Sequence, residues 1–411
     1  MRTLVVYGVR LIIQIALLFG LARWLGPTEF GEFAGVAALA MGLGTLSGFG
    51  LGFVVLAESA KSADAGQATL EQAVPATLLS AALLMPIYFW LAMGVLDSNA
   101  GLVGLVLIGL SELLLVPLLG LIGHRLHGLG FVASSQAVVL WPMALRLAGL
   151  IVCIMLEPAR TLDVYALVHG LGALFALALG WTLAGAKAVL PNRLRRPDWA
   201  TLRQGARYAL MNLAAMSPGE LDKALALRLI GSTGTGVYAL ASRSMVVVTL
   251  PVSAMLQAAL PRLIQGLHEP DRTHRQLLGL VLSLSGMYGM ASALLLHWAA
   301  PPLLEILFGE AYEGIGSVVA NIAWIAPFMS LRIATGATLF ALGRPLLRSS
   351  IEGSALAILV ALALILTPRF GIDGIVWAVL ISEAAMAAFG FVALTMCLRR
   401  ISPSLASPPL M

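Results

Sequence analysis

Residues 21–37 read LARWLGPTEFGEFAGVA, and residues 226–242 read ALRLIGSTGTGVYALAS. The two stretches align at an offset of 205 residues, half the length of the chain. The identical pairs are Arg23 and Arg228, Gly26 and Gly231, Thr28 and Thr233, Gly31 and Gly236, and Ala34 and Ala239. Each copy stands where one apolar run ends and the next begins. There a glycine can end a helix with a positive φ, and a threonine can cap the next helix. The pair therefore indicates a duplicated unit, and because an even number of runs separates the copies, the repeat is parallel.

The composition excludes a water-soluble protein. Hydrophobic residues make up 60% of the 411 residues, charged residues make up 11%, and the mean hydropathy is +0.95. Soluble domains are typically about 25% charged. In lipid, backbone groups must pair within helices or closed barrels, and the apolar runs here have the length of about 20 residues that a spanning helix needs. We therefore expect an all-α polytopic membrane protein.

The apolar runs predict about twelve transmembrane helices in two six-helix bundles. The expected spans are 3–25, 33–57, 74–96, 101–123, 131–156, 162–189, 206–230, 236–261, 276–298, 314–342, 349–367 and 374–398. The run 314–342 is long and contains Pro327, so its boundaries are the hardest to place. The predicted domains are an N-terminal bundle (1–190), a basic cytoplasmic linker (191–205) and a C-terminal bundle (206–411). Cys153 and Cys397 fall inside apolar runs, so we expect neither a disulfide nor a metal site.

Arginine and lysine gather in alternate loops, as the positive-inside rule describes. This pattern places both termini in the cytoplasm. The stretch from Lys187 to Arg203, KAVLPNRLRRPDWATLR, is the main polar segment in mid-chain. We interpret it as a topology anchor, with binding of anionic lipid headgroups as the alternative. The topology bias explains the net charge of +5, so no nucleic-acid partner is expected.

Three segments carry a resemblance to a known family. They are ARWLGPTEFGEFA (22–34), LDKALALRLIGSTGTGVYALASR (221–243) and LLEILFGEAYEG (303–314). With the length and the two bundles, they resemble the polysaccharide or O-antigen (Wzx-type) flippases of the multidrug/oligosaccharidyl-lipid/polysaccharide exporter (MOP) superfamily, whose fold is MATE-like. The resemblance implies a bacterial inner-membrane protein that flips a lipid-linked oligosaccharide to the outer leaflet by alternating access. It also implies membrane lipids as partners, with polysaccharide polymerase or export machinery as further candidates.

Five cations inside the predicted spans are candidates for substrate binding. They are Arg10, Arg146, Lys223, Arg243 and Arg332. A charge in mid-bilayer costs about 3 kcal/mol and usually faces a cavity or a partner. Guanidinium groups pair bidentately with phosphate oxygens, so we expect a shared cationic cavity for a polyprenyl diphosphate. The alternatives are snorkelling for Arg10 and Arg243, and a structural ion pair with Glu220 for Lys223.

Four carboxylates are candidates for binding a coupling proton or sodium ion. They are Glu112, Glu220, Asp222 and Glu383. A phosphate that competes for a neighbouring arginine would couple transport to their protonation. Glu112 and Glu383 can instead be groups that hydrogen-bond between helices. Because helix neighbours diverge by about 100°, we expect Asp222 to point away from Lys223, toward a partner such as Arg243. No cofactor is expected.

Two other functions remain open. A small-molecule or cation antiporter of the multidrug (MATE) branch needs an acidic or aromatic cavity, and the buried cations weigh against it. A membrane glycan-processing enzyme usually has a large external loop or a cluster of acidic residues and histidines. The external loops here are short and the histidines are scattered, so we do not expect an enzyme.

Overall fold

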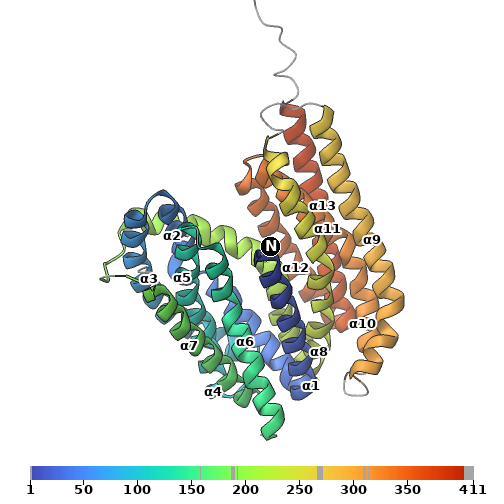
Figure 1. Ribbon diagram of the computed structural model, residues 1–411. Helices are drawn as coiled ribbons and strands as arrows, with labels where there is room; N and C mark the ends of the chain where they lie inside the picture. Colours follow the sequence, from blue (N-terminus) through green and yellow to red (C-terminus); the bar gives the residue numbers. More distant parts are fainter. Residues whose placement is uncertain are drawn as a thin grey trace, which may run out of the picture. The chain divides into compact units, whose positions relative to one another are not determined.

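The computed structural model describes residues 2–157, 159–186, 190–191, 193–265, 272–308, 312 and 314–401. In this part of the chain the regular structure is helical throughout (Figure 1). The chain divides into two compact units, Met1–Gly236 and Val237–Met411. Each unit is described by itself.

The first unit contains seven α-helices and the first part of an eighth. In chain order the elements are α1 (Arg2–Gly44), η1 (Ser47–Gly50), α2 (Leu51–Lys61), α3 (Ala63–Phe89), η2 (Trp90–Val95), α4 (Leu102–Leu110), η3 (Ser111–Leu115), α5 (Val116–Gly128), α6 (Val132–Leu156), α7 (Leu162–Ala186) and α8 (Trp199–Gln265). The segments η2 and η3 are π-helical turns, and η3 joins α4 and α5 into one long span. Such turns often occur at functional sites.

The second unit contains the rest of α8 and five more α-helices. They are α9 (Arg272–Phe308), α10 (Ile315–Ile322), η5 (Ala323–Ile325), α11 (Ala326–Ala341), α12 (Pro345–Phe370) and α13 (Ile372–Ile401). Helix α11 packs against α9 and α13, and α12 packs along α13 (Figure 1). The run 314–342 is divided by the 3₁₀ turn η5 directly before Pro327, because proline cannot continue the hydrogen bonding of a helix.

Ten of the described helices are long and apolar enough to cross a membrane. Two of them, Val9–Gly44 and Glu220–Leu256, are 36 and 37 residues long, whereas about 20 residues span a bilayer. Each bends at a glycine that separates two of the predicted spans. The described part of the chain therefore agrees with about twelve predicted membrane helices, and the protein is a multi-pass membrane protein.

The sequence repeat has a structural counterpart. The φ and ψ angles of Gly26 are 74° and 172°, and those of Gly231 are 73° and 176°. The sequence predicts a positive φ at both glycines, and the structure has it; ψ is extended rather than left-handed helical. Thr28 and Thr233 were expected to cap the next helices. Their Oγ1 atoms instead share a hydrogen bond of 2.9 Å, so the two copies meet inside the first unit.

Glycine permits this close crossing of α1 and α8. A Cβ atom on Gly31 would overlap the backbone oxygen of Ser232 and lie 2.6 Å from the backbone nitrogen of Gly236. A Cβ on Gly236 would overlap the backbone oxygen of Pro27. Any larger residue would force the two helix backbones apart.

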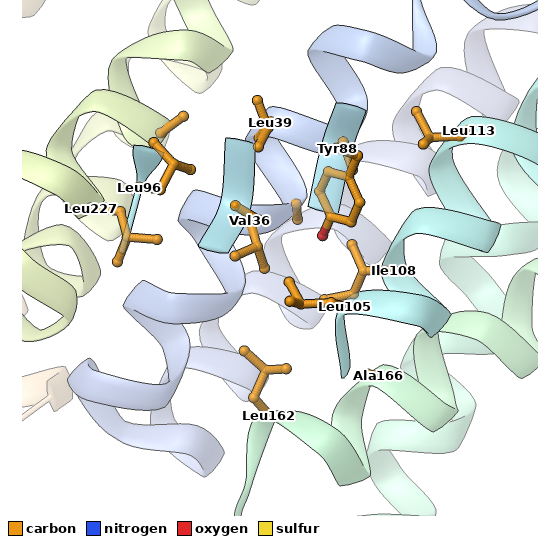
Figure 2. Close-up of a cluster of buried hydrophobic side chains, with 14 of the residues drawn as sticks. Val36, Leu39, Tyr88, Leu96, Leu105, Ile108, Leu113, Leu162, Ala166 and Leu227 are labelled. Carbon is orange, nitrogen blue, oxygen red and sulfur yellow. The ribbon is translucent and has the colours of Figure 1, made fainter. Parts of the chain in front are cut away.

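The first part of α8 belongs to the first unit. Its Leu227 packs in a cluster with residues of α1, α3, α4 and α7 (Figure 2), and the ring of its Tyr208 stacks on Phe53 of α2. The first compact unit therefore extends to Gly236 within α8, and the domain boundary at residues 191–205 stays a prediction.

The basic linker is bound to α3. The backbone N–H of Arg195 donates to the carbonyl of Glu71 at 2.9 Å, and Arg195 Nε forms an ion pair with the Glu71 carboxylate at 2.8 Å. Gln67 Nε2 donates to the carbonyl of Leu190, and Asp198 N donates to Gln72 Oε1. This part of the linker is therefore a strap along α3; residues 187–189 and 192 lie outside the described residues.

Candidate functional site

The first unit holds a buried charge cluster centred on Glu112. The π turn η3 places Glu112 opposite α6 and α7, and its carboxylate is almost fully buried. Its Oε1 accepts a hydrogen bond from Arg146 Nη2 at 2.9 Å and lies 2.8 Å from His169 Nε2. Arg146 also donates to Ser111 Oγ at 2.9 Å. These contacts supply the partners that a buried carboxylate and guanidinium need.

A glycine on α7 leaves room for the arginine. A Cβ atom on Gly172 would lie 2.9 Å from Arg146 Cγ and 3.3 Å from its backbone nitrogen. Arg146 also donates from Nε to the carbonyl of His169 at 3.4 Å. Both ends of its guanidinium are therefore engaged inside the bundle.

Two polar atoms near this cluster lack hydrogen-bond partners among the described residues. They are the hydroxyl of Tyr88 and Nδ1 of His169. Figure 2 shows the Tyr88 hydroxyl among apolar side chains that include Leu105 and Ile108. Phe33 packs edge-on against the His169 ring, with the ring centroids 5.4 Å apart. Glu112, Arg146 and His169 therefore form one buried polar cluster that joins η3, α6 and α7.

Three of the predicted site residues, Glu220, Asp222 and Lys223, lie together on α8 in the first unit. Lys223 Nζ is 3.5 Å from Glu220 and 3.3 Å from Asp222. The Lys223–Glu220 ion pair, the structural alternative to a substrate-binding role for Lys223, is present, and the prediction that Asp222 points away from Lys223 is wrong. The Asp222 carboxylate folds back along the helix and accepts from the backbone N–H of Lys223 at 2.8 Å, and the long lysine side chain reaches it.

The second unit contains two ion pairs. Arg332 on α11 donates from Nε to Glu383 of α13 at 2.6 Å. Arg348 donates from Nε to Glu352, four residues later on α12, at 2.9 Å. Arg332 and Glu383 are predicted site residues, whereas Arg348 and Glu352 were not predicted. The four-residue spacing of opposite charges was the signal that indicated this pair.

The remaining predicted cations are half buried. Arg10 lies on α1 and forms no ion pair with any described residue. Arg243 lies on the second part of α8, in the second unit. A single cavity lined by the cations of both halves stays a prediction.

Comparison with known proteins identifies the fold. No family model and no curated protein sequence matches the chain. Among solved structures, an inward-facing multidrug-resistance MATE transporter of the MOP superfamily is similar, with a TM-score of 0.78 and 14% identity over 97% of this chain and 96% of the other. A lipid II flippase, MurJ, in an inward closed conformation has a TM-score of 0.72 and 11% identity over 96% of this chain and 90% of the other.

A third structure belongs to a MOP superfamily transporter from Pyrococcus furiosus, described as having a binding pocket of reverse polarity. Its TM-score is 0.63, with 15% identity over 99% of this chain and 95% of the other. These identities are too low to transfer an activity. The similarity covers nearly all of each chain, and the fold is therefore that of MOP-superfamily transporters.

Proposed function

We propose that this protein is a flippase of the MOP type that moves a polyprenyl-diphosphate-linked oligosaccharide from the inner to the outer leaflet of a bacterial inner membrane. In this proposal it serves export of a polysaccharide such as O-antigen or exopolysaccharide, and it works by alternating access rather than as an enzyme. Two phosphates of the cargo must cross the low-dielectric interior of the bilayer. The carrier therefore needs cations whose charge is not already neutralised by its own carboxylates.

The balance of interior charges carries this proposal. Five buried carboxylates of the described residues have a cation within ion-pair distance. They are Glu71, Glu112, Asp222, Glu352 and Glu383. The sixth, Glu32, accepts hydrogen bonds from Ser98 and Asn99.

Two interior cations have no carboxylate within ion-pair distance among the described residues. Arg125 is 3% exposed, and its side chain donates to the carbonyl of Ala63; Arg10 is half buried. Among the described residues, every buried carboxylate is therefore ion-paired or hydrogen-bonded, whereas Arg125 and Arg10 keep positive charge that supports an anionic cargo.

Alternating access requires a contact that can open. The crossing of α1 and α8, where Gly31 meets Gly236 and Thr28 bonds to Thr233, is a small contact made by one hydrogen bond and close backbone packing. It lies at the helix ends that the charge pattern predicts to face outward. We assign it the role of the outer gate, which must separate when the carrier opens to the outside.

The Glu112 cluster is our candidate for coupling to a proton. A proton on His169 would place a second positive charge beside Arg146 and weaken its hold on Glu112. A cargo phosphate could then compete for the released guanidinium. Sodium remains the alternative coupling ion, and Glu220, Asp222 and Glu383 remain the other candidate groups.

The alternative is a MATE-type small-molecule or cation antiporter, a function described for one of the similar structures. Expression in strains that each lack a defined flippase distinguishes the two. Restored glycan export, with fewer lipid-linked intermediates by mass spectrometry, supports the flippase. Failure in every strain, together with drug efflux, supports the antiporter.

A matched pair of α1 variants tests the cationic path. Arg10→Gln removes a half-buried cation without leaving a carboxylate unpaired, and Arg23→Gln removes an exposed arginine from the same helix. We expect Arg10→Gln to lower export at least tenfold at equal protein level, and Arg23→Gln to leave it unchanged. Normal export by Arg10→Gln would remove Arg10 from the transport path.

A further inference from the structure

A small pocket that contains two arginines and a glutamate lies inside the second unit, between α11, α12 and α13. Arg332, Thr335 and Gly336 of α11 line one wall, and Arg348 and Glu352 of α12 line another. Its empty volume is about 230 Å³, including the open mouth. Inside that mouth there is room for about one water-sized group, so only the small end of a ligand can reach the two arginines.

The absence of a side chain at residue 336 allows one arginine to enter this pocket. A Cβ atom on Gly336 would lie 3.3 Å from Arg348 Nε and 3.6 Å from its Cζ. The guanidinium of Arg348 therefore lies against the backbone of α11. Gly336 is four residues after Arg332, about one helical turn. Arg332 therefore lies about one turn of α11 away from the place where Arg348 of α12 lies against that helix.

Both guanidinium groups keep donors available. Each binds a glutamate through Nε alone. Within the described residues, the terminal Nη nitrogens of Arg332 and Arg348 have no hydrogen-bond partner, and they are not among the fully buried unpaired atoms. In contrast, Arg146 in the first unit uses Nη2 for two hydrogen bonds and Nε for a third.

Two guanidinium groups that line one pocket inside a bundle repel each other, because little solvent screens their charges there. Glu383 and Glu352 offset this repulsion but leave the terminal donors unsatisfied. A tetrahedral oxyanion matches such donors, because guanidinium forks pair bidentately with phosphate oxygens.

We propose that this pocket binds a phosphate-class oxyanion between the terminal nitrogens of Arg332 and Arg348. Two sources carry this chemistry: the diphosphate of the lipid-linked cargo and the headgroup of an anionic phospholipid. Only the first source rests on the proposed function. Glu352 and Glu383 compete with the oxyanion for the same arginines, so they lower its affinity.

The test measures binding to the full-length purified protein. In neutral detergent, pyrophosphate is titrated at constant ionic strength while the Tm is recorded, since a ligand that binds the folded state raises it. In a second arm, the protein is placed in nanodiscs of phosphatidylcholine with or without phosphatidylglycerol. A Tm increase with pyrophosphate assigns the cargo-type anion, and an increase with phosphatidylglycerol alone assigns the lipid headgroup.

Three variants make the result specific to the pocket. Arg348→Gln should weaken the response at least tenfold. Arg344→Gln, an exposed arginine four residues earlier, should respond as the wild type does. Glu352→Gln removes a competitor and should tighten binding several-fold, whereas a purely structural ion pair predicts no change in anion response.

The proposal is overturned if neither arm changes the Tm, if Arg348→Gln responds like the wild type, or if Glu352→Gln binds the anion more weakly. Glycan export is measured separately. A negative binding result therefore removes this pocket and leaves the flippase proposal standing, while failed complementation removes the flippase and leaves a measured anion site.

Discussion

Replacing Gly31 with alanine should destabilise the protein through the crossing of α1 and α8. The new Cβ would overlap the backbone oxygen of Ser232 and stand 2.6 Å from the backbone nitrogen of Gly236, where ordinary contact begins at 3.4 Å. The obstacle is backbone and cannot rotate away, so the helices must separate by about 1 Å. Such overpacking typically costs about 1–3 kcal/mol.

The assay is thermal unfolding of the purified protein in detergent, followed by size-exclusion chromatography. For a chain of this size, the expected cost corresponds to a Tm lower by several degrees. Gly120→Ala on α5 is the matched control, because its Cβ would meet nothing within 4 Å. In a helix interior it should be neutral or stabilising by up to about 1 kcal/mol.

The double variant Gly31→Ala, Gly236→Ala tests whether both glycines serve one crossing. Once the helices have separated for one methyl group, the second costs less, so the two effects should sum to less than their separate values. The reasoning is refuted if Gly31→Ala melts at the same temperature as Gly120→Ala, or if the two alanines act independently.

Three further outcomes follow from the structure. The hydroxyls of Thr28 and Thr233 are 2.9 Å apart, so the double variant Thr28→Cys, Thr233→Cys should form a disulfide under oxidation. Transport should then stop until a reductant is added. Continued transport with the disulfide formed would exclude this crossing as the outer gate. Arg146→Gln should lower the free energy of unfolding by about 3–5 kcal/mol because it leaves Glu112 unpaired, and a second change, Glu112→Gln, should recover part of this loss in thermal melts. Hydrogen bonds from the backbone N–H and side chain three residues later hold the pKa of the Asp198 carboxyl below its ordinary value. Asp198 therefore stabilises the start of α8 above its ordinary pKa of 3.8, and this contribution should fade as the pH falls through the lowered pKa. In melts recorded across the acid range, Asp198→Ala should remove this part of the pH dependence and leave the part that the other carboxylates contribute.

Local signals in the sequence predicted most of the fold. Apolar runs located the spans because lipid requires about 20 apolar residues per helix. The glycines at 26 and 231 located the two bends because few other residues adopt their positive φ. The π turns η2 and η3 and the strap along α3 were not predicted, because they depend on contacts between segments far apart in the chain, such as Arg195 with Glu71.

The candidate site was predicted as a set of residues but not as pairs. Glu112 and Arg146 are 34 residues apart on different helices, and no spacing rule connects them. The prediction that Asp222 points away from Lys223 was wrong because it used only the angle of about 100° between neighbouring residues around the helix axis. The flexible carboxylate and the long lysine side chain can still meet beyond their Cβ atoms. Arg348 shows the opposite error: its four-residue spacing from Glu352 is a local signal for an ion pair, but neither residue was among the predicted site residues.

The duplication extends to the backbone geometry but not to the chemistry of the two units. Gly26 and Gly231 have nearly the same φ and ψ angles, so both copies keep the bend that fixes where the first helix of each half turns. The interior ion pairs differ: the Glu112 carboxylate is bound by a fully engaged arginine, whereas Arg332 keeps its terminal donors open. Under the proposed function, the open donors of Arg332 are available to a cargo phosphate directly, whereas Arg146 becomes available only after Glu112 releases it. Transport by a chain whose second unit lost its open guanidinium groups would contradict this division of roles.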